Sequence, residues 1–450
     1  MANSRARKTA RWLVAILLLT GGLTACGDGT TDAPPPAEAA SATAQATPAP
    51  TAAASATAAN GSGAVAAANL TYAIVDTGQL LFYGTEDAVT VPVPGDRLYG
   101  QDVAHNGFQP SYADNGDGTV TDLVTGLMWQ RGLGDKLTFM QAAAGAARSG
   151  LAGYDDWRLP TLKELYSLIL FSGTDPSGCE NSGPPPSGPP PTGSCDAVPF
   201  IDTDYFAFEY GDESEGGRMI DSQFISATRY VGTTMRADET VFGVNFADGR
   251  IKGYPIDWMT FYVRYVRGNP KYGINDFADN GDGTITDRAT ALIWTQADSG
   301  AGLNWEDAVG YCGTLDTAGN GGWRLPNVKE LQSIVDYMRS PGTTGSAAAD
   351  PIFEVSSIID EAGGVNYPAY WSSTTHVNLV NGRNAAYVAF GEALGWMPDP
   401  SGQYTLIDVH GAGAQRSDPK LGDPADWPNG LGPQGDVIRI FNYVRCVDDA

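Results

Sequence analysis

Asp114-Asn-Gly-Asp-Gly-Thr119 and Asp279-Asn-Gly-Asp-Gly-Thr284 are two copies of one hexapeptide. Each is followed by a tryptophan, Trp129 or Trp294, and then by the sequence Trp-Arg-Leu-Pro. Corresponding motifs are separated by 165 residues at the hexapeptide and 166 residues at Trp-Arg-Leu-Pro. Ordered motifs at a nearly constant distance indicate internal duplication, and the period far exceeds the roughly 20–50 residues of solenoid repeats. Each copy is therefore predicted to be a domain.

The N-terminus predicts an exported protein with a lipid anchor. A basic start precedes the apolar run 12–19, which is too short to span a bilayer. Leu23-Thr-Ala-Cys26 then resembles a bacterial lipobox, which implies a lipoprotein signal peptide over residues 1–25 and lipidation of Cys26. Glycine rather than aspartate follows Cys26, which favours the outer membrane over the inner one. The alternative is an ordinary secretory signal with an incidental cysteine.

The charge of the chain restricts its partners. The formal net charge is −25, and loss of residues 1–25, with four basic and no acidic side chains, takes it to −29. Such a surface repels nucleic acid and anionic lipid. We therefore expect no nucleic-acid partner, and we expect sulfated glycans to be disfavoured. The alternative explanation is that many exported proteins are simply acidic and soluble.

The cysteines fit an oxidising compartment. There are five, so four remain if Cys26 is acylated. Cys179 and Cys195 flank a proline-rich stretch, and a bridge between them would contribute about 3 kcal/mol in the chain-entropy model. Cys312 and Cys446 form the second predicted pair. No Cys-x-x-Cys occurs, which argues against zinc and thiol-redox sites.

The duplication supports the second cysteine pair. Val-Arg-Cys446-Val in the second copy matches Val-Arg-Tyr265-Val in the first. Cys312 falls opposite Ala146 or Ala147. The first copy lacks both cysteines, as expected if they are partners.

Composition divides the chain into segments. After the signal peptide, residues 26–69 contain the lipidated cysteine and an Ala/Thr/Pro-rich stretch that cannot bury a core and is predicted to be a disordered linker. Residues 70–97 are predicted as an N-terminal strand segment, with a strand pair around Thr77-Gly78. Repeat 1 is assigned to residues 98–269 and repeat 2 to residues 270–450, each long enough for its own core.

Both repeats predict the same order of elements. The Asn-Gly-Asp-Gly segment is typical of a tight turn between strands. Capping boxes predict a helix over 137–149 and a second helix after Thr161. Later segments favour strands, at 224–228, 241–246 and 262–266 in repeat 1 and at 370–374, 386–390 and 443–447 in repeat 2. Two helices followed by several strands form an α+β pattern.

These motifs carry a family resemblance. The ordered set Asn-Gly-Asp-Gly-Thr-(Val/Ile)-Thr-Asp, Gly-Leu-Met-Trp, Asp-Trp-Arg-Leu-Pro-Thr, Tyr-Trp-Ser-Ser-Thr and Val-Arg-Cys-Val resembles the Lcl C-terminal domain family, a domain of unknown function on bacterial exported proteins. The resemblance covers nearly all of residues 98–450, twice. It implies tandem C-type-lectin-like or formylglycine-generating-enzyme-like α+β domains. It also implies surface adhesion to sulfated polysaccharide in at least one member, a role with which the acidic charge of this chain disagrees.

Clustered carboxylates raise a calcium hypothesis. Hard cations bind clustered carboxylate and carbonyl oxygens, but the spacing here does not match an EF-hand loop. The alternative is that the side chains only stabilise the turn. The candidate ligands are Asp114, Asp117, Asp122, Asp279, Asp282 and Asp287.

Five aromatic residues of repeat 2 are the candidate ligand-binding set: Tyr370, Trp371, Trp396, Tyr404 and Trp427. They lie in the later part of the repeat, where loops are expected, and their ring faces could stack on sugars. Core packing is the alternative for Trp371. The Trp-Arg pairs at 157–158 and 323–324 are predicted to pack internally.

No catalytic residue is predicted. His376 and His410 could support a hydrolase with Ser372, Ser373 or Asp408, but no catalytic motif accompanies them. We expect a cell-envelope lipoprotein that acts as an extracellular binding or adhesion module for a glycan or a surface protein, with no cofactor unless calcium binds. The alternatives are an envelope structural protein with a protein partner, and a hydrolase.

Overall fold

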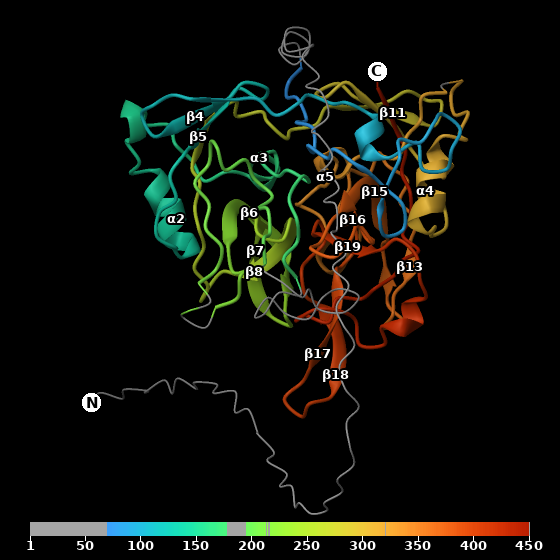
Figure 1. Ribbon diagram of the computed structural model, residues 1–450. Helices are drawn as coiled ribbons and strands as arrows, with labels where there is room; N and C mark the ends of the chain where they lie inside the picture. Colours follow the sequence, from blue (N-terminus) through green and yellow to red (C-terminus); the bar gives the residue numbers. More distant parts are fainter. Residues whose placement is uncertain (1–69, 178–194, 213, 215–216, 320, 450) are drawn as a thin grey trace, which may run out of the picture. The chain divides into compact units, whose positions relative to one another are not determined.

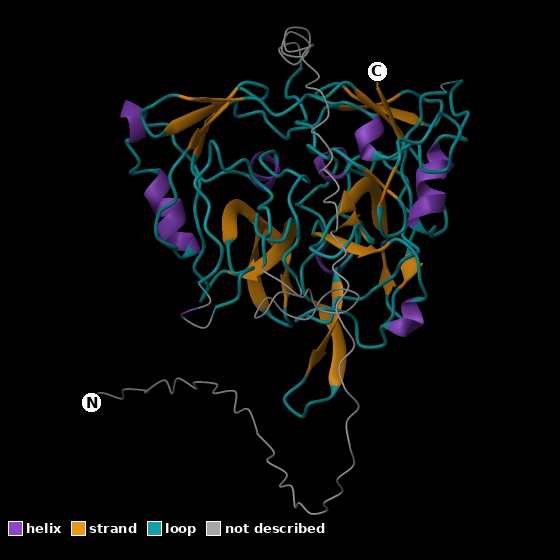
Figure 2. Ribbon diagram, viewed as in Figure 1, coloured by secondary structure: helices purple, strands orange, loops and turns teal. Residues whose placement is uncertain are grey.

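The computed structural model describes residues 70–177, 195–212, 214, 217–319 and 321–449. In this part of the chain strands are more extensive than helices, and long loops connect them (Figure 2). The predicted combination of helices and strands is therefore present, with strands dominant. None of the described helices combines the length and apolar character needed to cross a membrane.

Each repeat contains a four-stranded antiparallel sheet that begins with the hexapeptide hairpin. The last strand of the repeat pairs with the third, so the ends of each repeat meet in one sheet. Glycines at the turn have positive φ, 74° at Gly116 and 90° at Gly118, which disfavours other residues. The strands are β3 (Tyr112–Asp114), β4 (Thr119–Asp122), β5 (Leu127–Gln130) and β9 (Val266–Gly268), and β10 (Phe277–Asp279), β11 (Thr284–Asp287), β12 (Leu292–Thr295) and β20 (Val447–Asp449).

The described α-helices are short, and each begins at a residue whose side chain accepts a backbone N–H. Thr138 and Thr161 each form a capping box with the residue three positions on, and Asn327 does the same in repeat 2. Asn304 accepts a hydrogen bond from the backbone of Asp307. The helices are α2 (Phe139–Ala146), α3 (Leu162–Tyr166), α4 (Trp305–Cys312), α5 (Val328–Ser333) and α6 (Pro341–Thr344), with 3-10 turns η1 (Asp102–Ala104), η2 (Leu151–Gly153) and η4 (Pro424–Asp426).

One six-stranded sheet contains strands from both repeats, in the order β15-β16-β19-β8-β7-β6. The order is symmetric about the contact between β8 and β19, where Ile251 lies opposite Gln415. Repeat 1 supplies β6 (Gln223–Thr234), β7 (Asp238–Asn245) and β8 (Arg250–Pro255), and repeat 2 supplies β15 (Ala369–His376), β16 (Asn384–Ala389) and β19 (Gln415–Pro419).

The repeats differ most between the last two of these strands. Residues 246–249 link β7 to β8, whereas residues 390–414 link β16 to β19 and contain a separate hairpin, seen below the sheet in Figure 1. That hairpin consists of β17 (Leu394–Pro398) and β18 (Tyr404–Asp408). Two further strand pairs are β1 (Phe82–Tyr83) with β2 (Ala88–Val89), and β13 (Ile358–Ile359) with β14 (Val365–Asn366).

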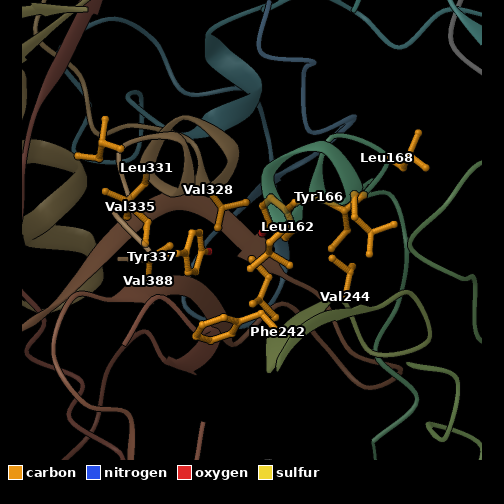
Figure 3. Packing of buried hydrophobic residues seen from close by; sticks show 14 of the residues in the cluster. Leu162, Tyr166, Leu168, Phe242, Val244, Val328, Leu331, Val335, Tyr337 and Val388 are labelled. Carbon is orange, nitrogen blue, oxygen red and sulfur yellow. The ribbon is translucent and has the colours of Figure 1, made fainter. Parts of the chain in front are cut away.

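The largest hydrophobic core is shared by the repeats. Leu162 and Tyr166 on α3 lie beside Val328 and Leu331 on α5, above the sheet residue Phe242 (Figure 3). All five side chains are buried. Since apolar burial contributes about 25 cal/mol per Å², much of the stabilisation of each repeat depends on the other.

Two equivalent lysines tie the helices together reciprocally. Lys163 Nζ donates to the carbonyl of Ser333 at 2.6 Å, and Lys329 Nζ donates to the carbonyl of Ser167 at 2.9 Å. Burial lowers the pKa of Lys163 to about 8 and that of Lys329 to about 7. Together with the shared sheet and core, these contacts make residues of both repeats part of one compact unit.

The N-terminal segment corrects one prediction. The expected strand pair around Thr77-Gly78 is not formed in the described residues, because this stretch bonds to both repeats instead. Asp76 donates its backbone N–H to Phe108, and Thr77 accepts from Phe171. Gln79 exchanges two hydrogen bonds with the backbone of Thr375. The segment is thus a connection across the repeats.

The disulfide between Cys312 and Cys446 is confirmed. It joins α4 to the chain just before β20. At the equivalent place in repeat 1, the Tyr265 hydroxyl donates to the carbonyl of Ala142 on α2 at 2.9 Å. One repeat therefore uses a covalent bond where the other uses a tyrosine. The predicted bridge between Cys179 and Cys195 involves Cys179, which, like Cys26, lies outside the described residues.

Candidate functional site

The Asp-rich turns have a structural role. Asp114 accepts a hydrogen bond from Gly116 N at 2.9 Å, and Asp117 accepts from both N and Oγ1 of Thr119. Asp279 and Asp282 repeat this pattern in the second copy. Their carboxylates therefore order the turn rather than converge on a common point.

The remaining two candidate ligands, Asp122 and Asp287, are buried and accept backbone N–H groups of their own turns. Among the described residues no three His, Cys, Asp or Glu side chains form a group that could hold a metal ion. The hydrogen bonds within the turns account for the equivalent positions of these carboxylates in both copies.

The structure separates the five predicted aromatic residues. Tyr370 and Trp371 are 1% and 0% exposed, so their ring faces are not available to a ligand. The Tyr370 hydroxyl donates to Asp298, and Trp371 Nε1 donates to Leu303. For this pair the ligand-binding prediction is wrong, because β15 places both side chains in the core.

The other three aromatic residues are more accessible. Trp396 lies on β17 opposite Leu406, and Tyr404 lies on β18 opposite Pro398, so both side chains occupy the same face of the hairpin. Tyr404 is 51% exposed and Trp396 is half-buried. Trp427 lies at the end of η4.

The Trp-Arg pairs are internal, as predicted. Arg324 forms two hydrogen bonds of 2.7 Å with Glu330, and Arg158 pairs with Glu164. The indole of Trp323 donates to the carbonyl of Thr317. Since Glu164 and Glu330 also cap their helices, each arginine fixes the start of a helix to the preceding loop.

A cavity of about 280 Å³ lies at the contact between β8 and β19. Gln415 accepts a hydrogen bond from Tyr166 on α3, so Ile251 and Gln415 face the helices. Neighbouring strand residues point to opposite faces. Lys252 and Arg416 therefore point to the sheet face opposite α3, and both line the cavity.

The cavity is lined by basic and acidic side chains in equal number. Among the described residues it is lined by four basic and four acidic side chains, together with His410: Arg218, Arg250, Lys252, Arg416, Asp221, Asp238, Asp248 and Asp436.

Two ion-paired groups contain most of these side chains. In one, Asp248 pairs with both Arg250 and Lys252. In the other, Asp436 accepts a hydrogen bond from Arg416, and its Oδ1 lies 2.8 Å from Nε2 of His410.

Burial and neighbouring charges set the protonation of these groups. Burial lowers the pKa of Lys252 to about 8, although Asp248 opposes this shift. Burial likewise lowers the pKa of His410 to about 4, so the imidazole is neutral at pH 7. Burial alone would raise the pKa of Asp436, but Arg416 and His410 hold it well below its usual range.

Several buried polar atoms around the cavity have no hydrogen-bond partner among the described residues. They are Nε and Nη1 of Arg416, the hydroxyl of Tyr254, Nδ1 of His410 and Oδ1 of Asp248. Leaving such groups unpaired costs about 1–3 kcal/mol each. Concentration of unpaired donors at one cavity is therefore a mark of a ligand site.

Trp258 adds an aromatic wall to the cavity. It is 69% exposed, the highest value for a described tryptophan, and it lines the cavity with Tyr254 and Met259. A larger hollow of about 560 Å³ between β6 and residues 340–343 has no unpaired buried polar atom among its described lining residues. The cavity at the β8–β19 contact is thus the better candidate.

The histidines do not meet the serines that the sequence analysis paired with them. His376 is fully buried, with Nδ1 2.9 Å from Ser417 Oγ and Nε2 2.9 Å from the Asp248 carbonyl. Ser372 donates instead to Ala386. Arg250 also donates to Ser417 Oγ, at 3.3 Å.

His410 bonds to Asp436 and lines the cavity, whereas the predicted partner Asp408 accepts from Tyr230 and from the backbone of Gly411. None of the predicted hydrolase pairs is therefore assembled as expected.

Comparison with known proteins fits this duplicated architecture. The model of the Lcl C-terminal domain matches residues 118–267 and 283–407, together more than half of the chain. The chain belongs to the Lcl C-terminal domain family. No curated protein and no solved structure matches the chain.

The first match includes β8 and the second ends before β19, so the cavity is lined by residues of the first matched domain and by residues 409–438, which follow the second match. Of the lining residues, His410 was named from the sequence, whereas Lys252, Tyr254, Trp258 and Arg416 were not predicted. No local pattern marks them, since they come from segments about 160 residues apart. The only signal that could have paired these segments is that β8 and β19 hold equivalent places in the two repeats.

Proposed function

We propose that this protein is a cell-envelope lipoprotein that binds an extracellular ligand, with a glycan as the favoured class. One observation carries the proposal: the cavity at the β8–β19 contact combines unpaired buried donors with an exposed tryptophan. Ligand sites are typically concave, with aromatic walls and a few directed polar groups, and have volumes of about 300–1,000 Å³. The cavity is near the lower limit, which suits one sugar ring.

One contact favours binding over catalysis. His410 pairs with Asp436, but no serine hydroxyl among the described residues lies within hydrogen-bond reach of it. The Ser417 hydroxyl lies beside His376 and also accepts a hydrogen bond from Arg250. That bond reduces the nucleophilicity of the hydroxyl oxygen. We expect no labelling of Ser417 by a fluorophosphonate probe, and labelling lost in Ser417→Ala would favour the hydrolase.

The proposed fold and anchor rest on the family and on the lipobox. We infer that each repeat is lectin-like, and the pairing of its first strands with its last strand supports that inference. We infer outer-membrane attachment through Cys26. Incorporation of an alkyne-labelled fatty acid in cells should disappear in Cys26→Ser. Labelling that persists in this variant would contradict the anchor.

A glycan-array screen tests the binding function. The full-length chain in mild detergent should give saturable hits, and Trp258→Ala should abolish them. Trp396→Ala/Trp427→Ala should leave them unchanged if the cavity is the site, whereas the opposite result would place binding on the β17–β18 face.

The screen is run with calcium and with a chelator. Calcium-dependent hits would restore the Asp-rich turns as metal candidates.

A protein partner is the second candidate, because the β17–β18 hairpin is an addition that repeat 1 lacks and carries the exposed Tyr404. A blank array together with one stable crosslinked protein in cells would favour this structural role.

A further inference from the structure

The unpaired polar groups of the cavity indicate the charge of its ligand. Arg416 uses Nη2 to bind Asp436, while its Nε and Nη1 have no partner among the described residues. Arg416 is 8% exposed, and the nearby Tyr254, with its unpaired hydroxyl, is 7% exposed. Three unpaired donor atoms therefore belong to side chains that line the cavity and are more than nine-tenths buried.

We propose that the cavity binds a sugar ring bearing a carboxylate, with Arg416 and Tyr254 as its donors and Trp258 stacked on the ring. This proposal rests on the binding function above and names the ligand class of the same site. A carboxylate has two oxygens that each accept more than one hydrogen bond. It can therefore satisfy Nε or Nη1 of Arg416 and the Tyr254 hydroxyl together, as charge-assisted bonds to the guanidinium.

The acceptor side of the cavity suits the ring hydroxyls. Oδ2 of Asp248 receives Lys252 and Arg250, but Oδ1 is unpaired. A hydroxyl donor from the ligand can bond to Oδ1 without removing an ion pair. Nδ1 of His410 is a second unpaired position. The polar floor thus has donors for an acid group and an acceptor for a neutral hydroxyl.

Trp258 gives the third part of the site. Its side chain is 69% exposed and lines the cavity. An aromatic ring that presents an apolar face next to polar groups binds the apolar face of a sugar ring well. An exposed tryptophan leaves apolar surface in contact with water. A ligand that stacks on the ring would bury this surface.

The charge balance explains why the ligand should carry one acidic group and not many. The four basic and four acidic side chains of the cavity cancel, and Arg416 has two buried donor atoms without a partner among the described residues. Outside the cavity the chain is strongly acidic, with net charge −25. A densely sulfated chain would meet repulsion at every other contact. A single carboxylate is accommodated by the buried arginine, where salt screens weakly.

Isothermal titration calorimetry tests the ligand class. The full-length chain in mild detergent is titrated with glucuronate and galacturonate, and with glucose, galactose and glucose 6-sulfate as probes. We expect the two uronates to bind at least tenfold more tightly than their neutral parents and than the sulfated sugar. Affinity for the uronates should change less than threefold between 50 and 300 mM salt, an expectation that follows from the burial of the site.

Three variants locate the site. Trp258→Ala and Arg416→Lys should each weaken uronate binding at least tenfold. Phe441→Ala, which removes a half-exposed aromatic residue outside the cavity, should leave binding unchanged. Trp258 is exposed, so its replacement does not threaten folding, and the melting temperature of Arg416→Lys checks that variant.

Each contrary outcome has a distinct meaning. Equal binding of neutral sugars, lost in Trp258→Ala, would overturn the carboxylate inference and keep the binding function. Equal binding of glucose 6-sulfate would overturn the choice of carboxylate. Uronate binding unchanged in Trp258→Ala and Arg416→Lys would overturn the site. Binding of no sugar, here and on the array, would overturn both proposals.

Discussion

At the scale of single residues, burial decides which aromatic side chains can meet a ligand. Tyr370-Trp371 and Trp258 are equally aromatic in the sequence, but the first pair lies on β15, where every residue is buried, and Trp258 lies in the loop after β8. Burial of about 25 cal/mol per Å² favours packing wherever a strand is covered on both faces. The sequence alone cannot show which strands are covered.

The arginine of the Val-Arg motif shows a similar dependence on context. Arg264 and Arg445 are buried, and each donates to three backbone carbonyls. Each also stacks on aromatic rings, including Tyr370 beside Arg445. Burial lowers the pKa of Arg264 to about 9, still charged at neutral pH. The motif is therefore structural, and carbonyls take the place of a carboxylate partner.

Asp102 predicts a pH dependence of stability. Its Oδ2 accepts from Thr77 at 2.8 Å and from Thr374 at 2.5 Å. Burial, and then the charge of Asp76, raises the pKa of Asp102 to about 7. The folded state therefore holds a proton that the unfolded state releases. This contribution to stability is complete below about pH 4 and is lost as the pH rises to about 7.

Asp102→Asn mimics the protonated carboxyl, so the variant should not lose this contribution. We expect its free energy of unfolding to exceed that of the parent increasingly between pH 4 and pH 7, by up to about 1.4 kcal/mol per pH unit. Urea unfolding at four pH values measures the difference. The exposed control Asp87→Asn should show a constant difference. A constant difference for Asp102→Asn as well would refute the prediction.

At the scale of elements, local chemistry made some parts predictable. The hexapeptide turn needs positive φ, and the helix starts need a side-chain acceptor, so both are visible in the sequence. In contrast, β8 and β19 were not predicted. Arg250–Pro255 and Gln415–Pro419 are polar and end in proline, and only their partner strands make them strands. The predicted strands at 262–266 and 443–447 contribute only their last residues to β9 and β20.

Equivalent helices predict opposite effects of one substitution. Gly145 on α2 and Gly310 on α4 are both helix-interior glycines, where alanine is favoured by about 1 kcal/mol. A Cβ at Gly310 meets no atom within 4 Å, whereas a Cβ at Gly145 would lie 2.1 Å from the Tyr265 hydroxyl. Gly145→Ala must displace that hydroxyl from its bond to Ala142.

We expect Gly310→Ala to stabilise the protein by about 1 kcal/mol and Gly145→Ala to stabilise it less or to destabilise it. The two variants are compared by thermal unfolding with the disulfide intact. An equal increase in stability for both variants would mean that the Tyr265 hydroxyl moves without a free-energy cost. Its bond to Ala142 would then not stabilise repeat 1 as the disulfide stabilises repeat 2.

At the scale of the whole molecule, the duplication forms one folding unit. The sheet passes from β19 to β8, the largest core contains residues of both repeats, and Lys163 and Lys329 reach across reciprocally. The N-terminal stretch around Thr77 bonds to both repeats. Separation would expose a sheet edge and part of the core, and would remove the Ser333 carbonyl from Lys163 and the Ser167 carbonyl from Lys329.

We therefore expect one cooperative unfolding transition for the full chain. Tryptophan fluorescence and far-UV circular dichroism in urea should give coincident curves, because Trp129 and Trp294 report on different repeats and the dichroism reports on both. Two resolved transitions would show that the repeats unfold independently. Lys329→Met should lower the single midpoint without separating the curves.

The sequence by itself determined the duplication, the hairpin turns, the helix caps and the pairing of Cys312 with Cys446. These depend on motifs, on backbone conformations that few residues adopt and on comparison of two copies within one chain. Tertiary structure alone decided that the repeats share a sheet, that Trp371 is buried and Trp258 exposed, and that Lys252 and Arg416 meet at a cavity. Burial and charge pairing depend on which distant segments come together, and no local stretch of sequence specifies that.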